Sequence, residues 1–348
     1  MSAPEPPEPT LGELLDERLR ELHERHRPLG AGASARYYTP GRGYSETPWG
    51  GEDELFAISF VTPEGEKHSV GDHERLFPLQ SLSKVFTYVL ALQDLGRERV
   101  LERVGVAPSG EEFSAIEFDE RHHRPHNPMV NAGALVTTEL VRGTDPAEKL
   151  DRILEVLRAC AGNPTLAIDE ETLYREGSDN DHNRAVAYLM RSQRMLLGDV
   201  EDALSVYLGA CSVMVTSADL AVMGATLALG GVNPVTGERV LTRARTRDVL
   251  TVMYTCGMYD FAGEWAFDVG VPAKSSVSGG VLAAIPEKMG VAVFSPGLDE
   301  YGNSVRGTRV CQDVSVRLGL HVFATEDDDV LLDPAEVEAG IAATPLED

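Results

Sequence analysis

The chain has 348 residues, of which 43% are hydrophobic, enough to bury one large core or two modest ones. Its formal net charge is −25, and such a surface repels phosphate backbones and anionic lipids. We therefore expect no nucleic acid and no membrane surface among its partners. The four cysteines lack paired short spacings, which argues against a zinc site and against a disulfide framework.

The beginning of the chain shows no targeting segment. Residues 1–9 are acidic and rich in proline, without the basic and apolar regions of a signal peptide. No stretch of the sequence has the length of a membrane span. We therefore expect a cytoplasmic protein whose disordered first residues lead into an amphipathic helix over residues 10–26.

An ordered loop and a strand pair are predicted next. Residues 30–52 are rich in Gly, Tyr and Pro and indicate an ordered loop. Residues 55–61 predict a strand, and residues 63–65 a turn into a short partner strand at residues 68–70. In the loop, Tyr38 closely precedes Pro40. Our hypothesis is that Tyr38 closes over bound ligand as part of a hinged lid, and the equally weighted alternative is a surface loop whose tyrosines pack on the edge of the sheet.

A buried helix is predicted over residues 82–95, where the sequence is apolar on nearly every face. Pro78 lies just ahead of it, and Gly96 is placed as the residue that ends it. Ser81 then lies in the first turn, where backbone N–H groups have no intrahelical partner. Lys84 follows three residues later and shares a face with the Ser81 hydroxyl.

From residue 97 the pattern is helical for more than a hundred residues, and strands return only near the end. The predicted helices run over residues 129–141, from Asp145-Pro146 to Gly162, and over residues 182–197, 200–210, 217–229 (capped by Ser217) and 244–256. Closing strands are predicted over residues 271–285 and 291–294, with an amphipathic helix over 303–320.

This order of elements predicts an α/β (α+β) fold, an antiparallel sheet flanked by helices with an inserted all-α domain. We assign the following segments: residues 1–27, a disordered segment and amphipathic helix; 28–84 and 206–322, the α/β domain; 85–205, the all-helical domain; 323–348, an acidic C-terminal tail.

Ser81 and Lys84 are the first candidates for catalysis. A lysine in apolar surroundings has a lowered pKa, because burial disfavours its charged form. A neutral amine beside a serine hydroxyl makes a nucleophile with its base. The spacing alone is a weak signal, and the alternative is a helix-capping Ser81 beside a surface Lys84. The buried helix argues against that alternative.

Lys274-Ser275 at the start of the closing strand is a second motif. Serine-x-x-lysine followed by lysine-serine on a strand is the plan of serine–lysine acyl enzymes. In that plan the N–H groups of the strand and of the nucleophile form the oxyanion hole.

Two other patterns are interpreted as loop composition. Ser178-Asp179-Asn180 matches a motif of penicillin-recognising enzymes, but its surroundings do not. His122, His123 and His126 could suggest a metal site. Pro125 breaks any helix there, so we expect a solvated loop.

Five stretches together resemble the bacterial-type glutaminases, a serine-dependent family that shares the β-lactamase fold. The resemblance covers residues 30–320. The stretches are Gln80 to Phe86, Asn127 to Ala134, Glu176 to Arg184, Tyr207 to Ser212, and Met258 to Val277.

The resemblance implies hydrolysis of L-glutamine to L-glutamate and ammonia, without metal or cofactor, on a β-lactamase-like sheet. By position, Ser81 is the nucleophile, Lys84 its base partner and Tyr207 a proton relay. Four further residues, Asn131, Glu176, Asn183 and Tyr259, hold the amino-acid end of the substrate. Val277 binds the substrate through its backbone N–H, which forms the oxyanion hole together with the N–H of Ser81. We also expect a homodimer or homotetramer.

The sequence departs from the family pattern in the closing motif, where Ser276 and Ser278 replace two glycines. If those glycines admit the substrate closely, the mouth of the pocket is narrower here. Two other functions remain open: a penicillin-binding or β-lactamase activity on the same fold, and a catalytically silent amino-acid sensor. The missing export signal argues against the first. The presence of Ser81, Lys84 and Tyr207 together argues against the second.

Overall fold

The computed structural model describes residues 11–29, 32–34, 36–39, 43–46, 54–110, 118–178 and 180–324. The predicted disordered N-terminus and almost all of the predicted acidic tail lie outside the described residues.

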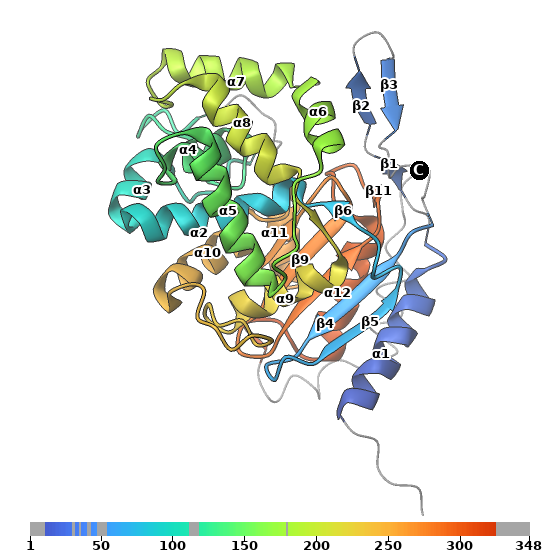
Figure 1. The fold of residues 1–348 in the computed structure, drawn as a ribbon. Coiled ribbons are helices and arrows are strands. Elements are labelled where there is room, and N and C mark those ends of the chain that lie inside the picture. The colour runs from blue at the N-terminus through green and yellow to red at the C-terminus, as the bar shows by residue number, and fades with distance from the viewer. Residues whose placement is uncertain are drawn as a thin grey trace, which may run out of the picture.

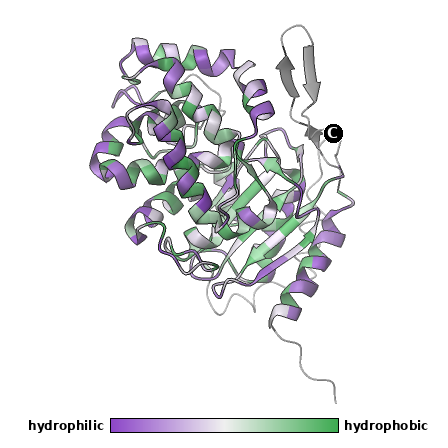
Figure 2. Ribbon diagram, in the orientation of Figure 1, coloured by the Kyte–Doolittle hydropathy of each residue, from purple (hydrophilic) through white to green (hydrophobic). Residues whose placement is uncertain are grey.

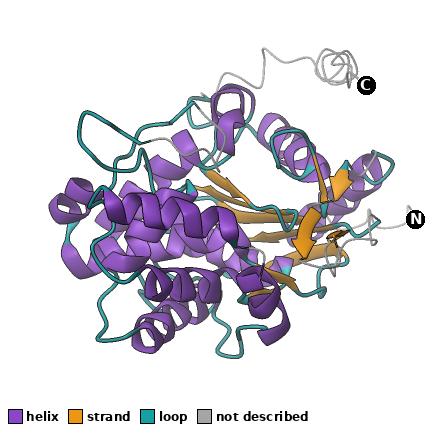
Figure 3. Cartoon of the chain, turned by 90° about the horizontal axis from the view of Figure 1, so that it is seen from above, coloured by secondary structure: helices purple, strands orange, loops and turns teal. Residues whose placement is uncertain are grey.

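A five-stranded antiparallel sheet with the strand order β5-β4-β10-β9-β8 forms the centre of the fold (Figure 1). Its strands are β4 (Ala57–Val61), β5 (Lys67–Gly71), β8 (Ala273–Ser275), β9 (Gly280–Ile285) and β10 (Met289–Phe294). Every residue of β4 and β9 is buried, because helices cover both faces of the sheet, as the view from above shows (Figure 3). The predicted antiparallel sheet flanked by helices is therefore confirmed.

One face of the sheet packs against the two ends of the chain. Helices α1 (Leu11–His26) and α12 (Val305–Arg317) share a hydrophobic cluster with side chains of β4, β9 and β10. Polar contacts add to it, since His26 Nε2 lies 2.9 Å from Asp313 Oδ2 of α12. The amphipathic pattern over residues 10–26 thus correctly predicts a helix with a buried face.

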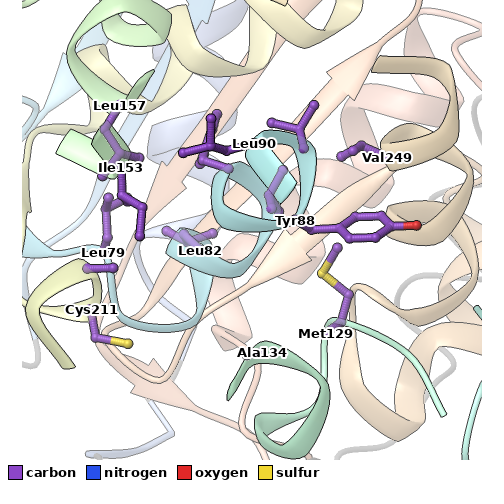
Figure 4. Close-up of a cluster of buried hydrophobic side chains, with 14 of the residues drawn as sticks. Leu79, Leu82, Tyr88, Leu90, Met129, Ala134, Ile153, Leu157, Cys211 and Val249 are labelled. Carbon is purple, nitrogen blue, oxygen red and sulfur yellow. The ribbon is translucent and has the colours of Figure 1, made fainter. Parts of the chain in front are cut away.

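The other face carries the central helix α2 (Ser83–Leu95). Ten consecutive residues from Ser83 to Leu92 are buried, and the close-up shows side chains of other elements around it, among them Leu157, Met129 and Val249 (Figure 4). Gly96 ends it with φ of 84°. The prediction of a helix buried on all sides and ended by Gly96 is confirmed.

The remaining helices belong to the block between the strands or follow it, and helices α3 to α8 gather on one side of the sheet (Figure 1). They are α3 (Arg97–Arg103), α4 (Asn131–Leu140), α5 (Pro146–Ala161), α6 (Glu170–Ser178), α7 (Asp181–Ser192), α8 (Val200–Cys211), α9 (Ser217–Ala228), α10 (Arg243–Cys256) and α11 (Ala262–Asp268).

The predicted caps of helix α5 are confirmed, whereas the predicted cap of helix α9 is wrong. Asp145 caps α5 through its side chain, and Gly162 ends that helix in the left-handed conformation, as predicted. Helix α9 is capped by Thr216, which forms a capping box with Asp219. The predicted cap, Ser217, is instead the first residue of that helix.

Two predictions about the strands are wrong. The predicted strand over residues 271–285 is two strands, because a turn closed by Gly279 N–H donating to Ser276 O separates β8 from β9. The predicted loop over residues 30–52 contains strands β1 (Ala33–Ser34), β2 (Arg36–Thr39) and β3 (Gly43–Glu46). Strand β1 pairs with β11 (Gly297–Leu298), and β2 pairs with β3.

The distribution of hydropathy follows this arrangement. The strands of the sheet are mostly hydrophobic, and the outer helices carry hydrophilic residues on their exposed sides (Figure 2). Within the described part of the chain, no helix combines the length and the apolar character needed to cross a membrane.

Candidate active site

Ser81 lies in a short 3-10 turn, η1 (Gln80–Leu82), immediately before α2. The sequence predicts it in the first turn of the α-helix itself, whereas the α-helix begins at Ser83. Strand β6 (Phe77–Pro78) fixes the entry to this turn by pairing with β7 (Met214–Val215). Gln80 has φ of +49°, a left-handed conformation that costs a residue with a side chain about 1–3 kcal/mol and is concentrated at functional sites.

Lys84 is the partner of Ser81, as the sequence predicts. It is only 1% exposed, and its Nζ lies 3.2 Å from Ser81 Oγ and 2.6 Å from Asn131 Oδ1. Burial lowers the pKa of Lys84 from its usual 10.5 to about 8. No carboxylate pairs with its amine among the described residues, so at slightly alkaline pH the amine can be neutral and accept a proton.

A chain of amide side chains fixes the orientation of Asn131. Its Oδ1 accepts from Lys84 Nζ and from Tyr207 Oη, and its Nδ2 donates to Asn183 Oδ1 at 2.9 Å. Asn183 Nδ2 in turn donates to Asn180 Oδ1 at 2.8 Å. Asn180, interpreted from the sequence as loop composition, is buried and supports the two predicted ligand-binding amides.

Tyr207, on α8, contacts the same amide oxygen as Lys84. Its hydroxyl donates to Asn131 Oδ1 at 3.3 Å, and burial, with Cys211 nearby, raises the pKa of the phenol well above its usual value. The phenol therefore stays protonated at any physiological pH. Within the described residues its hydroxyl contacts Asn131 and Cys211 rather than the Ser81 hydroxyl.

Tyr259 contacts the nucleophile directly. It lies in the 3-10 turn η2 (Tyr259–Phe261) with φ of +57°, so two residues of the site have left-handed backbones. Its hydroxyl donates to Ser275 O at 3.2 Å and is hydrogen-bonded to the Ser81 side chain. Because the phenol proton is used toward Ser275, the Ser81 hydroxyl is the donor of that second bond.

Lys274 supports the position of Tyr259. Its fully buried Nζ donates to Gly257 O at 3.1 Å and to Ser275 O at 2.5 Å, and lies 4.3 Å from the centre of the Tyr259 ring. Burial lowers the pKa of Lys274 well below its usual value. The second lysine of the two-motif pattern therefore bonds backbone carbonyls, and we regard it as a positioning residue.

Glu176 is hydrogen-bonded to Gln80, the residue just before the nucleophile. Gln80 Nε2 donates to Glu176 Oε1 at 2.7 Å, across 96 positions of sequence. The carboxylate of α6 is thereby brought to the turn that carries Ser81. The sequence predicts a role for Glu176 but none for Gln80. The left-handed backbone of Gln80 is not visible in the residue pattern.

Val277 lies in the turn between β8 and β9, half-buried. Neither its N–H nor that of Ser81 donates to a group of the described residues, so both are available to an oxyanion. The Ser276 hydroxyl donates to Leu79 O at 3.1 Å and lies 2.9 Å from Ser278 Oγ. The two serines that replace family glycines are thus buried, and they join this turn to the segment before Ser81.

The structure therefore joins Ser81, Lys84, Asn131, Asn183, Tyr207 and Tyr259 in one connected set of hydrogen bonds. Glu176 is held beside it through Gln80, and Val277 lies on the adjoining turn. Sequence reasoning gave no role in the site to the side chains of Gln80 and Asn180, which bond Glu176 and Asn183. It named Ser276 only as a replaced glycine, and the bond of its hydroxyl to Leu79 O was not predicted. Away from this site, His122 pairs with Asp119 at 2.7 Å. Among the residues that the structure describes, no group of three or more His, Cys, Asp or Glu side chains is arranged to hold a metal ion.

Comparison with known proteins agrees with these observations. The family model described as Glutaminase matches residues 51–323. A glutaminase of Nostoc sp. is 49% identical over 305 residues, which is 88% of this chain and 89% of that protein. Glutaminase 2 of Clostridium perfringens is 44% identical over 272 residues, 78% of this chain and 89% of that protein.

Solved structures show the same similarity. A probable glutaminase superposes with a TM-score of 0.83 at 38% identity, covering 89% of this chain and 98% of that one. The protein Mglu in its glutamate form gives 0.82 at 41% identity, covering 90% of this chain and 70% of that one. On the family match and these identities, the chain belongs to the glutaminase family.

Proposed function

We propose that this protein is a glutaminase that hydrolyses L-glutamine to L-glutamate and ammonia through a serine acyl-enzyme. The observation that carries the proposal is the contact between Ser81 Oγ and the buried amine of Lys84 at 3.2 Å. A desolvated amine with a pKa of about 8 is a base poised near physiological pH, and the hydroxyl beside it is the attacking group.

In the acylation step, Ser81 Oγ attacks the side-chain carboxamide carbon of glutamine and gives its proton to Lys84 Nζ. The carboxamide oxygen becomes an oxyanion, and the N–H groups of Ser81 and Val277 stabilise it. Collapse of this intermediate breaks the carbon–nitrogen bond. The leaving nitrogen takes the proton from Lys84, with Tyr207 as a protonated relay, and departs as ammonia.

In the deacylation step, water attacks the ester carbon and gives a proton to Lys84. The bond between that carbon and Ser81 Oγ breaks, and the serine regains its proton. Glutamate leaves. The base, nucleophile and oxyanion donors thus return to their starting state, and neither step needs a group beyond the side chains named.

The amino-acid end of glutamine pairs with the polar groups around the nucleophile. Glu176 accepts hydrogen bonds from the substrate ammonium, because a carboxylate is the strongest partner for that group. The amides of Asn131 and Asn183 supply donors for the substrate carboxylate, and the hydroxyl of Tyr259 does so when its proton turns from Ser275 O toward the substrate. The bond between Gln80 and Glu176 supports this, since it holds the acid at the turn of the nucleophile.

Ammonia release from the purified protein tests the proposal, with L-glutamine, L-asparagine and D-glutamine compared at equal concentration. We expect turnover of L-glutamine and far slower release from the other two. Hydrolysis of nitrocefin without ammonia release would favour a β-lactamase. Binding of glutamine without turnover of any substrate would favour a silent sensor.

Three further properties belong to the same proposal. We place the protein in the cytoplasm, because its four cysteines are buried as free thiols, which suits a reducing compartment. It forms a homodimer or homotetramer, to which exposed apolar residues of the helical block, such as Tyr174 and Tyr188, can contribute. Light scattering of the eluted protein tests this assembly.

The third property is a division into domains. Residues 28–84 and 206–322 form an α/β domain around the sheet, and residues 85–205 an all-helical domain. The largest hydrophobic cluster contains members from both, such as Phe77 and Leu157. The two parts therefore unfold together, and calorimetry giving a single transition would support this view.

A further inference from the structure

The groove beside helix α10 is the surface on which a new inference rests. It has a volume of about 580 Å³ and lies between α10, the end of α9 and the turn that joins β9 to β10. Leu227, Leu250, Tyr254 and Pro272 give it an apolar floor. It shares no lining residue with the site around Ser81, and the proposed reaction makes no use of it.

The described chain ends in this groove. Val322 and Phe323 line it, and Val322 is fixed there because its N–H donates to Gly270 O at 2.9 Å. Phe323 is nevertheless 75% exposed. The next residues of the chain, from Thr325 onward, therefore start at the wall of the groove.

Positive charge gathers at one end of the groove, although the whole chain is acidic. Arg243, Arg245 and Arg247 occupy the first turns of α10, whose first turn holds no acidic residue. Arginines there oppose the helix dipole, which favours negative charge at an N-terminus. An acidic segment lying over this end would offset the unfavourable arrangement.

The local carboxylates do not balance these arginines. Asp248 is shared by Arg97, Arg245 and Arg247 at distances of 3.4 to 3.7 Å. Arg243 forms no ion pair with a described residue and lines the groove. Arg97, Arg245 and Asp248 do not line the groove, so its charged lining consists of Arg243 and Arg247 at this end and Glu287 on the opposite wall, which leaves a net charge of +1 among the lining residues.

The segment that follows has the complementary composition. Residues 325–348 contain nine Asp and Glu and no Lys or Arg. Four consecutive acids, Glu326 to Asp329, precede the apolar Val330, Leu331 and Leu332. Seven extended residues reach about 23 Å, which exceeds the length of about 21 Å expected for the 14 residues of α10.

We propose that residues 325–332 of the same chain occupy this groove. The chain enters at the Tyr254 end, so the acids from Glu326 to Asp329 lie against Arg247 and Arg243 farther along α10, and Val330 to Leu332 reach Leu229 at the far end of the groove. The short connection to Phe323 favours the tail over an external ligand, because a segment held at the groove wall has a high effective concentration there.

Hydrogen exchange on the 348-residue chain, followed by mass spectrometry, tests the proposal. We expect amides of residues 326–332 to exchange at least about tenfold more slowly than in a free peptide of that sequence. Arg243→Glu with Arg247→Glu should remove this protection. The variant should still fold, because glutamates at a helix N-terminus are favourable. Arg20→Glu with Arg99→Glu makes the same charge change on exposed residues of other helices and should leave the protection intact.

Two more variants separate the contributions. Leu331→Asp should abolish the protection without touching the groove. Asp327→Arg with Asp328→Arg should restore it in the Arg243→Glu/Arg247→Glu background. Tail amides that exchange at the free-peptide rate in the wild type would overturn the proposal. Protection that grows with protein concentration would also overturn it, because the occupant would then be a second copy.

Discussion

The pH dependence of catalysis follows from the burial of Lys84. Its amine must be neutral to accept the proton of Ser81, and its pKa is lowered to about 8. The neutral fraction is then about 1% at pH 6, about 10% at pH 7 and about 50% at pH 8. Activity should therefore rise with pH, and kcat/KM for glutamine should increase about fiftyfold between pH 6 and pH 8 before levelling.

Three lysine variants test this assignment in the same buffers. Lys84→Arg should stay inactive up to pH 10, because a guanidinium with a pKa above about 12 cannot act as a base. Lys84→Ala should lose roughly 10² or more in kcat and, with it, the inflection near pH 8. Lys288→Ala changes an exposed lysine of the turn between β9 and β10 and should keep the wild-type profile.

The reasoning fails if kcat/KM is flat between pH 6 and pH 8. It also fails if the residual activity of Lys84→Ala keeps the inflection, because another group would then be titrating. A normal lysine would shift the rise by more than two pH units, to about 10.5. The position of the rise therefore separates a buried base from an exposed one.

Three further predictions concern the neighbours of this pair. Ser81→Ala should abolish turnover while the fold persists, and a glutamine-derived diazoketone should label only the wild type; an adduct mapped elsewhere by mass spectrometry would contradict the assignment. Tyr207→Phe combined with Lys84→Ala should cost no more than the larger single effect, because both serve one proton path; multiplying effects would make one of them structural. Glu176→Gln should raise KM roughly tenfold or more, since a hydrogen bond to a charged group contributes about 1.5–3 kcal/mol; an unchanged KM would place Glu176 outside the pocket.

Much of this site can be predicted from sequence because burial leaves a visible pattern. Continuous apolar residues around Lys84 predict a helix without a solvent face, and the structure confirms it. The chemistry of a lysine there follows from desolvation alone. Spacing in the sequence carries no information about which distant residues contact Ser81 and Lys84. Only the family resemblance predicts those residues.

The partners of those residues could not be predicted in the same way. The bond between Ser81 and Tyr259 joins positions 178 residues apart and depends on where β8 lies in the sheet. The left-handed backbones of Gln80 and Tyr259 leave no mark on hydrophobic periodicity. The missed turn between β8 and β9 does have a signal, since Ser278-Gly279 is a common turn dipeptide, but the surrounding apolar residues favoured one long strand.

The last prediction concerns the hairpin of β2 and β3, which carries the expected lid residue Tyr38. Strand β1 anchors the hairpin, pairing with β11 directly after Gly32. Gly32 has φ of +73°, and a Cβ there would lie 2.3 Å from Leu298 O. Gly32→Ala should therefore displace β1 and misplace the hairpin. If Tyr38 closes over glutamine, KM should rise in this variant and in Tyr38→Ala.

Gly237 is a matched control, because its φ is +74° and a Cβ there meets nothing within 4 Å. Gly237→Ala has the same backbone strain without the clash, so it should lower stability slightly and leave KM unchanged. Hydrogen exchange of residues 34–44 with and without glutamate then decides the role of the hairpin. A lid must be held in place by the ligand that it covers. If the amides of this segment exchange at the same rate with and without glutamate, Tyr38 is not part of a lid, whatever KM the two variants show.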